Sequence, residues 1–395
     1  MAQLEPPTTA QPATLQLATR NPSWQARPVL ICLSYLRWDF AWQRPHHLMS
    51  RAAACCDVIF VEEPIIVDSA AVPHFTVRDT PSGVRVACLR APSGLPPAGI
   101  ARLMRENMAQ LAPPDRPLLL WFCTAMGLPF ASSLRSDFAV YDCMDDLQSF
   151  RGAPPELAAL EDALLQRVQL VIAGGRSLFR SRQGRHPNMH LFPSSIDTAH
   201  FAPARQPGPV AAAVASLPRP RIGFFGVIDE RLDVDLIAAI AARRPDWQLV
   251  MIGPTAKIDP AGLPRPPNIH WLGPVDYADL PLHLRGWDAG FMPFALNDAT
   301  RHISPTKTPE FLAAGVPVVS TSVPDVVHDW GHVIGIADDP DAFVAALEAA
   351  LRHGRRDRLE SVDRALARSS WDRTWRQIAD LIPALSTTKG SGLHV

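Results

Sequence analysis

A chain of 395 residues is too long to fold around one compact core and fits two domains of ordinary size. Hydrophobic residues make up 47% of the sequence and charged residues 19%, which is typical of a soluble, globular protein. The 38 basic and 39 acidic side chains nearly cancel, so the charge balance excludes a protein whose main task is to bind nucleic acid.

Cysteine usage and hydropathy indicate the compartment. Six cysteines are present without a C-x-x-C pair, and most lie within apolar runs, which predicts reduced thiols in the core of a cytosolic protein. The N-terminus lacks the basic-then-apolar order of a signal peptide, and no apolar run approaches the roughly 20 residues that span a bilayer. We therefore expect a cytoplasmic protein, and peripheral contact with the inner face of the membrane stays open.

The first 27 residues are rich in Pro, Gln, Thr and Ala without a periodic apolar pattern, which predicts a disordered tail. Order is expected from Pro28–Ser34, a continuous apolar run typical of a central parallel strand. A polar and aromatic loop, Tyr35–Arg44, follows and leads through Pro45 into a helix. In open α/β folds this loop lies at the carboxyl ends of the strands, where ligands bind. Its tryptophans suit either a binding site or the packing of the sheet edge.

Further apolar runs predict more strands and two helices in the first half of the chain. The strands are Val58–Val61, Phe75–Val77, Val84–Leu89, Leu118–Cys123, Phe138–Tyr141 and Val171–Ala173, and the helices are Ile100–Leu111 and Leu157–Leu170. The first of these helices is amphipathic, and packing on the core is favoured over contact with a membrane surface. Asp145 and Asp146 follow one strand end, where they suit either a catalytic base or a helix N-cap.

A Pro- and Ala-rich stretch, residues 202–220, predicts a linker between two domains. Strands and helices start afresh after it and end in an amphipathic helix over Trp371–Ile382. Two such β/α runs indicate two Rossmann-like domains that face each other across a cleft. The strands expected in the second run are Arg221–Phe225, Gln248–Ile252, Ile269–Leu272, Ala289–Phe294 and Val318–Ser320.

The stretch Arg301–Val326 carries the most specific pattern in the sequence. Ser304-Pro305-Thr306 supplies two hydroxyls and a proline suited to the first turn of a helix. Lys307 follows in that turn, and Glu310 lies three residues further on, so both project from nearly the same face. A helix N-terminus with a lysine and hydroxyls is an anion site, and a carboxylate one turn later suits a sugar diol.

A second glycine-rich turn stands in the same half of the chain. Gly223-Phe224-Phe225-Gly226 joins a strand to a helix, where glycines let backbone N–H groups approach phosphate, and Arg231 adds a positive charge. The turn is neither G-x-G-x-x-G nor a P-loop, which disfavours a nicotinamide oxidoreductase. Together with Ser304–Glu310 it predicts a two-sided clamp for a diphosphate.

The string from Ser304 to Val319 resembles the nucleotide-sugar site of retaining GT-B glycosyltransferases of family 4, whose core reads S-P-x-K-x-x-E-x-L-A-x-G-x-P-V-V. The resemblance extends over residues 28–382. It implies an α/β, GT-B architecture of two Rossmann-like domains facing across a cleft, with a C-terminal helix that crosses back to the first domain. The implied bounds are 28–201 for the acceptor-side domain, 221–368 for the nucleotide-sugar-binding domain, 369–385 for the crossing helix and 386–395 for a frayed tail.

The resemblance also implies roles for the diphosphate clamp. Lys307 and Arg231 would neutralise the donor diphosphate without a metal ion, so neither a metal site nor a cofactor is expected. Glu310 would hold the ribose hydroxyls of the nucleotide. The other donor contacts would come from Ser304, Pro305, Thr306 and the backbone of Gly226 around the phosphates, and from the turn at Gly273 beside the base.

Two further segments, QRPHH (Gln43–His47) and YDCMDD (Tyr141–Asp146), resemble motifs of a bacterial polysaccharide subgroup of these transferases and would line the acceptor side. A catalytic base is needed if the reaction inverts the anomeric configuration, whereas in a retaining reaction the departing phosphate can take the acceptor proton. The acceptor-side residues expected are Trp38, Gln43, Arg44 and His46, and the candidate bases are Asp145, Asp146 and Asp39.

Two features depart from the family pattern. A second glutamate often precedes the ribose glutamate with seven residues between them, and that position is His302 here. Because the missing glutamate usually approaches the transferred sugar, His302, Asn297 or Asp298 would take its place. The Gly-Gly loop that usually follows the first strand is replaced by the Trp-rich loop, which implies a different acceptor mouth.

These observations predict a glycosyltransferase that moves a sugar from a UDP- or GDP-linked donor to a glycan or lipid-linked acceptor in surface polysaccharide synthesis. Retention of configuration and independence of metal ions are expected. Two alternatives stay open. One is a nucleotide-sugar 2-epimerase, which would need first-domain carboxylates over the donor and no acceptor mouth. The other is a non-catalytic nucleotide-sugar-binding protein, which the missing glutamate would suit.

Overall fold

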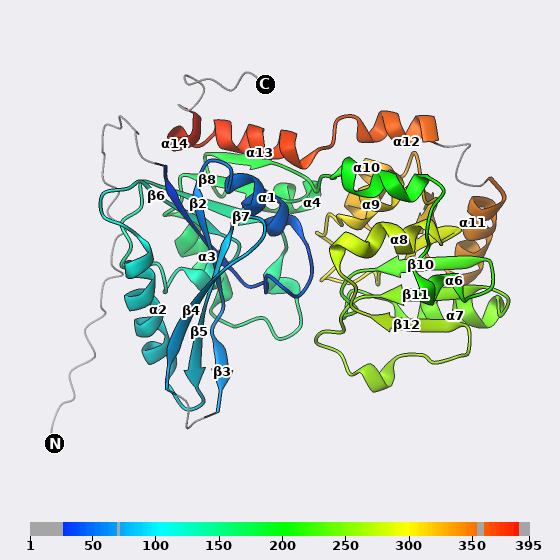
Figure 1. The fold of residues 1–395 in the computed structure, drawn as a ribbon, viewed down its shortest axis with the longest axis horizontal. Helices are drawn as coiled ribbons and strands as arrows, with labels where there is room; N and C mark the ends of the chain where they lie inside the picture. The colour runs from blue at the N-terminus through cyan, green and yellow to red at the C-terminus, as the bar shows by residue number, and fades with distance from the viewer. Residues whose placement is uncertain (1–26, 69–71, 354–358, 387–395) are drawn as a thin grey trace.

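A computed structural model gives the structure of the protein and describes residues 27–68, 72–353 and 359–386. Two lobes lie side by side, one built from the blue-to-green part of the chain and the other from the green-to-orange part (Figure 1). The predicted disordered tail, apart from Arg27, and the predicted frayed end from residue 387 lie outside the described residues. Among the described helices, none combines the length and the apolar character needed to cross a membrane.

The first lobe is built on a nine-stranded sheet in the order β3-β5-β2-β1-β6-β7-β8-β9, with β4 pairing antiparallel to β5. Every strand predicted in this half is present. The short strands β3 and β9 were not predicted, because three residues leave almost no periodic pattern. The strands are β1 (Val29–Ser34), β2 (Asp57–Glu62), β3 (Ile65–Val67), β4 (His74–Asp79), β5 (Arg85–Pro92), β6 (Leu118–Phe122), β7 (Phe138–Cys143), β8 (Leu170–Ala173) and β9 (Met189–Leu191).

Helices cover both faces of this sheet, because successive side chains of a buried strand point to opposite faces. Leu30 and Cys32 of β1 pack on one face with α1, whereas Ile31 and Leu33 pack on the other with α2, α3 and α4. The predicted helix over 157–170 is too long, since α3 ends at Leu165 so that the chain can turn into β8. The helices are α1 (Arg44–Ala52), α2 (Pro97–Leu111), α3 (Leu157–Leu165) and α4 (Arg176–Arg182).

The second lobe holds a six-stranded parallel sheet in the order β12-β11-β10-β13-β14-β15. Three of its strands, β10, β11 and β14, have the predicted bounds. Its strands are β10 (Arg221–Phe225), β11 (Gln248–Ile252), β12 (Ile269–Gly273), β13 (Ala289–Met292), β14 (Val318–Ser320) and β15 (Gly335–Ile336). Its helices are α7 (Val234–Arg243), α8 (Leu280–Arg285), α9 (Lys307–Ala313), α10 (Pro324–Trp330) and α11 (Pro340–His353).

The segment between the sheets is folded against the second lobe rather than being an open linker. It contains α5 (Thr198–Phe201), a 3-10 turn over Ala202–Arg205 and α6 (Ala212–Ala215). Arg205 Nε donates a hydrogen bond to the carbonyl of Ala313 at 2.7 Å, beside the end of α9. The proline and alanine content therefore indicated the segment between the two sheets, but it did not predict the short helices in that segment.

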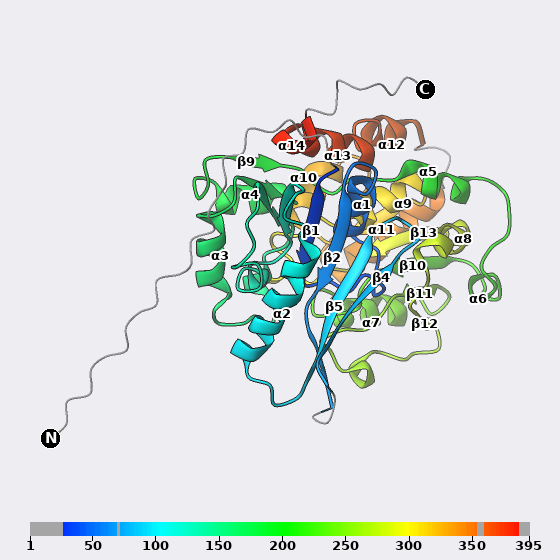
Figure 2. The ribbon, with the colours of Figure 1, turned by 60° about the vertical axis from the view of Figure 1, so that its left-hand side comes forward.

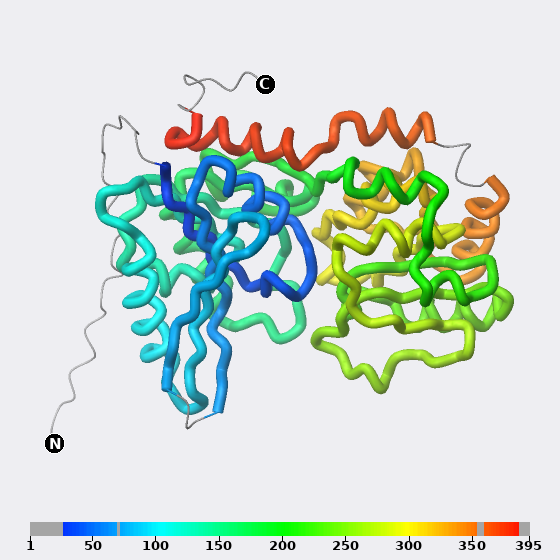
Figure 3. The backbone as a smooth tube through the Cα atoms, in the orientation of Figure 1, coloured from blue at the N-terminus to red at the C-terminus, as the bar shows by residue number. Residues whose placement is uncertain are grey.

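The C-terminal helices run along one side of both lobes, as Figures 1 and 3 show. They are α12 (Leu359–Leu366), α13 (Trp371–Asp380) and α14 (Pro383–Ser386). The expectation that a C-terminal helix crosses back to the first domain is confirmed, because Trp371, Trp375 and Ile378 are buried in the same core cluster as β1 and α1. The Trp371 indole stacks on the His47 ring at a centroid distance of 4.8 Å.

Each sheet has its topological switch point at its first strand. β1 lies between β2 and β6, and β10 lies between β11 and β13, so the chain leaves each first strand at a crevice in the sheet. Figure 2 shows β1 and β2 in front and the second sheet behind them. The loop after β1 and the loop after β10 are therefore the segments best placed to hold a ligand.

We predict that Trp371→Ala destabilises the protein by about 3–5 kcal/mol, because it removes a fully buried indole from the contact between α13 and α1. Gln377→Ala, at an exposed position of the same helix, is the matched control and should stay within about 0.5 kcal/mol of wild type. Chemical unfolding of both variants provides the measurement. Equal stability of the two would show that the helix does not brace the first lobe.

Candidate functional site

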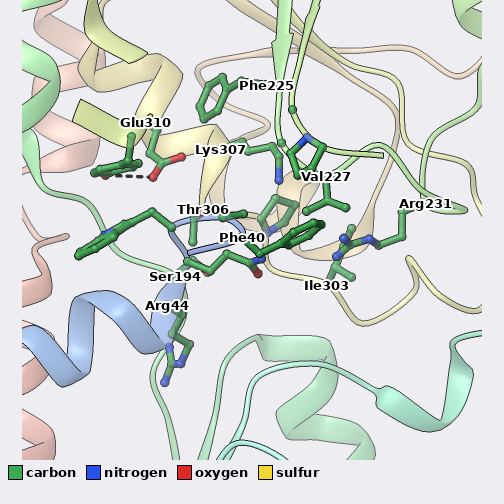
Figure 4. Close-up of a pocket in the computed structure, with 18 of the residues that line it drawn as sticks. Phe40, Arg44, Ser194, Phe225, Val227, Arg231, Ile303, Thr306, Lys307 and Glu310 are labelled. Atoms are coloured by element: carbon green, nitrogen blue, oxygen red, sulfur yellow. Dashed lines mark hydrogen bonds between the residues drawn. The ribbon is translucent and has the colours of Figure 1, made fainter. Parts of the chain in front are cut away.

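A pocket lies between the two lobes, where the loop after β1 and the end of β7 face the loop after β10 and the start of α9 (Figure 4). Both switch points thus open into one site. Its apolar walls include Phe40, Trp42 and Phe225. Its polar lining residues are Gln43, Arg44, Asp145, Ser194, Arg231, Tyr277, Ser304, Thr306, Lys307 and Glu310.

Lys307 is the first residue of α9, and its side chain extends into this pocket (Figure 4). A Cβ built on Gly226 would lie 1.8 Å from Lys307 Cε and 2.6 Å from Nζ, so the lysine packs directly on the glycine backbone. Gly226 has a φ of 137°, which side chains disfavour. Burial, together with the nearby Arg231, lowers the pKa of Lys307. No carboxylate within the described ranges forms a salt bridge with this ammonium group.

Arg231 reaches the pocket from the loop after β10 and is oriented by Asp229. Its Nε donates to both carboxylate oxygens of Asp229, at 2.9 and 3.1 Å, and its Nη2 donates to Oδ2 at 2.6 Å. Burial opposes the charge, but the buried Asp229 outweighs it, so the pKa of Arg231 is raised. Sequence reasoning missed Asp229, because it acts by holding another side chain.

Glu310 lies one turn into α9 and is 3% exposed. The Tyr277 hydroxyl donates to Glu310 Oε1 at 3.4 Å, and the Tyr277 ring stacks on His200 at 4.3 Å. Burial raises the pKa of Glu310, and Lys307 opposes that rise. The predicted spacing thus brings a cation and an enclosed carboxylate to one pocket, and the structure adds Tyr277, which had no motif to reveal it.

Ser304, Pro305 and Thr306 line the pocket just before α9. Ser194 of the first lobe contacts this segment, since its Oγ donates to the Ser304 carbonyl at 2.5 Å and its N–H donates to Ser304 Oγ at 3.4 Å. Gly273 ends β12 with a φ of 74°, and the pocket is lined by the two residues after it, Pro274 and Val275. The predicted donor residues other than Gly273 and His302 therefore line one cavity.

Only some of the four predicted acceptor-side residues line the pocket. Gln43 lines the pocket, whereas the Arg44 guanidinium points away from it (Figure 4) and forms a buried ion pair with Asp142, Nε to Oδ1, at 2.9 Å. Trp38 and His46 are buried and bond to each other through His46 Nε2 and the Trp38 carbonyl at 2.9 Å. Arg44 therefore lines the pocket without turning its charge toward it, whereas Trp38 and His46 shape the loop and do not line the pocket.

Of the three candidate bases, one lines the pocket and two do not. Asp145 lines the pocket, and its Oδ2 accepts a hydrogen bond from the Tyr35 hydroxyl at 2.6 Å. Asp146 is engaged by Arg182 at 2.6 Å and by Ser149 at 2.8 Å. Asp39 is exposed and pairs with Arg78. The geometry favours Asp145, because the other two carboxylates do not line the pocket and are paired with arginines.

The position where the family often has a second glutamate does not reach the pocket. His302 lies at the contact between lobes, where a Cβ on Gly175 would be 3.6 Å from its carbonyl oxygen. Asn297 exchanges hydrogen bonds with Thr300, and Asp298 pairs with Arg301 at 2.6 Å. None of the three proposed substitutes lines the pocket. Its carboxylates are Glu310 and, from the first lobe, Asp145.

A second cavity adjoins the first and lies between the same lobes. Its lining includes Tyr35, Phe150 and Lys257, and the Phe150 ring lies 5.2 Å from Lys257 Nζ. Phe40, which is 40% exposed, lines both cavities, although no sequence motif includes it. The residues common to both cavities are Phe40, Gln43, Asp145, Val227 and Arg231.

The described residues contain no group of three or more His, Cys, Asp or Glu side chains arranged to hold a metal ion. All six cysteines are free thiols, five of them buried, as the apolar runs around them predict.

Comparisons with known proteins agree on one family. The family model described as glycosyl transferases group 1 matches residues 219–353, the part of the chain that carries Arg231, Lys307 and Glu310. A relative from Bacillus subtilis (strain 168), named teichuronic acid biosynthesis glycosyltransferase TuaH, is 30% identical over 285 residues, which cover 66% of this chain and 70% of that protein.

Solved structures share the fold at low identity. Sucrose-phosphate synthase from Thermosynechococcus elongatus superposes with a TM-score of 0.66 at 16% identity. The superposition covers 92% of this chain and 100% of the synthase chain. A trehalose-6-phosphate structure from E. coli, bound with UDP-2-fluoro glucose, superposes with a TM-score of 0.62 at 14% identity. The superposition covers 89% of this chain and 98% of the E. coli chain. These likenesses confirm the GT-B architecture expected from the sequence.

We predict that Gly226→Ala displaces Lys307 from the pocket, because the new Cβ would overlap Lys307 Cε. Binding of UDP or GDP should fall at least tenfold. Gly94→Ala is the matched control, since Gly94 also has a positive φ, of 93°, but nothing lies within 4 Å of a Cβ there. Isothermal titration of both variants gives the affinities. Unchanged affinity in Gly226→Ala would contradict the contact.

Proposed function

The chain belongs to the group 1 family of glycosyl transferases, and from this premise we propose that it transfers a sugar from a UDP-linked donor to a glycan or lipid-linked acceptor, with retention and without a metal ion. The observation that carries the proposal is the pairing of two cations with an enclosed carboxylate in one pocket. Lys307 and Arg231 suit a diphosphate, and Glu310, one turn further into α9, suits the ribose hydroxyls.

The cations serve the leaving group of the reaction. As the bond between the anomeric carbon and the β-phosphate oxygen breaks, its electron pair stays with the diphosphate, where Lys307 and Arg231 stabilise the added charge. The acceptor hydroxyl oxygen forms the new glycosidic bond and releases its proton to the departing phosphate oxygen. Two fixed cations supply the stabilisation that a metal ion would otherwise give, which supports independence of metal ions.

The acceptor is proposed to lie in the second cavity. Phe40, Gln43 and Asp145 line both cavities, so a sugar that leaves the first passes these residues to reach the second. The apolar wall formed by Leu147, Phe150 and Pro154 suits the face of a sugar ring or the start of a lipid. The name of the Bacillus relative supports an acceptor in surface polysaccharide synthesis, and the nucleotide in the E. coli structure supports UDP as the donor base.

We predict that Lys307→Ala and Glu310→Ala each weaken UDP binding by roughly ten- to hundredfold, because each removes a charge-assisted contact worth about 1.5–3 kcal/mol. Arg265→Ala, an exposed cation that lines neither cavity, is the control and should bind as wild type does. Isothermal titration gives the affinities, and thermal unfolding checks the fold. Wild-type affinity in both Ala variants would remove the donor site from this pocket.

We predict that UDP, among UDP, GDP, ADP, TDP and NAD, raises the melting temperature most, and that EDTA leaves the shift unchanged. Release of UDP from a UDP-sugar should likewise survive EDTA, because Lys307 and Arg231 carry the charge. A shift with NAD alone would contradict the proposal. Conversion of the donor to its 2-epimer, followed by NMR, would instead identify an epimerase.

A further inference from the structure

We propose that Tyr35 positions the Asp145 carboxylate to accept a hydrogen bond from the acceptor, beside the hydroxyl whose proton passes to the departing phosphate. This inference rests on the proposed transfer function and names a residue to which neither the motifs nor the family resemblance assigned a role. Tyr35 follows β1 directly, Asp145 lies just after β7, and the two are 110 residues apart in the sequence. The fold alone brings them together.

All three tyrosines of the chain donate a hydrogen bond to a carboxylate. Tyr277 donates to Glu310, Tyr141 donates to Glu161 at 2.9 Å, and Tyr35 donates to Asp145 at 2.6 Å. Tyr141 and Glu161 lie away from both cavities, whereas the other two carboxylates line the first cavity. The Tyr35–Asp145 pair is the one that stands where the two cavities meet.

The hydrogen bond settles which oxygen of Asp145 is free. Oδ2 is taken by the Tyr35 hydroxyl, and within the described residues no hydrogen bond or salt bridge engages Oδ1. Burial and the Asp145 charge raise the pKa of Tyr35, so the phenol keeps its proton and remains a donor at neutral pH. Tyr35 therefore fixes the rotamer of Asp145 and leaves Oδ1 to accept a hydrogen bond from the acceptor.

Several charged groups face Asp145 from the surrounding elements. Arg231 and Lys307 come from the second lobe, and each is held in the charged form in part by Asp145. Asp142, on the same strand end, is neutralised by its ion pair with Arg44. Tyr35→Phe removes the phenol hydroxyl and leaves each of these charged side chains chemically unaltered. The variant therefore frees Oδ2 of Asp145 while the charges around the carboxylate stay the same.

The test compares Tyr35→Phe with Tyr141→Phe, which removes the same kind of hydrogen bond away from the cavities. The reaction measured is UDP release from a UDP-sugar, with water as the acceptor. In Tyr35→Phe kcat should fall at least tenfold, whereas UDP affinity should stay within twofold of wild type. Tyr141→Phe should keep the wild-type kcat.

Two further arms separate positioning of Asp145 from a loss of stability. The carboxyl resonance of Asp145 is followed by NMR on protein with ¹³C-labelled aspartate and is assigned by its loss in Asp145→Asn. Its chemical shift should change in Tyr35→Phe, which loses the hydrogen bond, and not in Tyr141→Phe. In the Asp145→Asn background, Tyr35→Phe should change kcat less than twofold, because Tyr35 would act through Asp145.

An unchanged Asp145 resonance in Tyr35→Phe would overturn the inference, and so would a full further loss of kcat in the Asp145→Asn background. A failure of the proposed function gives a different result. If wild-type protein binds no nucleoside diphosphate, the donor site is absent, whereas the NMR spectra still decide whether Tyr35 holds Asp145.

Discussion

The ammonium group of Lys307 is held in the pocket by close packing on Gly226, and no carboxylate in the described part of the chain forms a salt bridge with it. Three effects act against it: burial removes water, Arg231 adds like charge, and a position in the first turn of α9 meets the positive end of the helix dipole. A diphosphate would relieve all three at once. Gly253 must also be a glycine, since a Cβ there would lie 1.9 Å from the Gly226 carbonyl oxygen. Two glycines in tight contact thus make room for one cation.

The other half of the site depends on how the lobes meet. Asp325 at the start of α10 accepts a hydrogen bond from the Ser177 N–H at 2.9 Å, and Arg176 pairs with Asp329 at 2.5 Å, so α10 contacts the start of α4. A Cβ on Gly175 would lie 2.5 Å from Asp325 Oδ2, which shows how closely this side chain approaches the Gly175 backbone. With α13 across the top of both lobes (Figure 1), these contacts keep Asp145 in the same pocket as Lys307 and Arg231.

Sequence reasoning worked where one local segment carries both structure and chemistry. Buried parallel strands are continuous apolar runs, and the segment from Ser304 to Glu310 fixes a helix start, a lysine and a carboxylate by spacing alone. It failed where a role depends on residues far apart in the sequence. Arg44 was expected at the acceptor, yet Asp142, 98 residues away, turns its guanidinium into the core. Asp229 and Tyr35 had no signal, because each acts only through the neighbour that the fold supplies.

The carboxylates of the pocket come from both lobes. His302, at the position where the family resemblance leads one to expect a second glutamate, lies at the lobe contact, so Glu310 is the carboxylate that the second lobe contributes to the pocket. The other, Asp145, comes from the first lobe, whereas Lys307 and Arg231 both come from the second. The groups that the proposal assigns to the nucleotide therefore all lie on the second lobe, and the first lobe adds its carboxylate where the two cavities meet. The complete arrangement of charges thus depends on how the two lobes pack against each other.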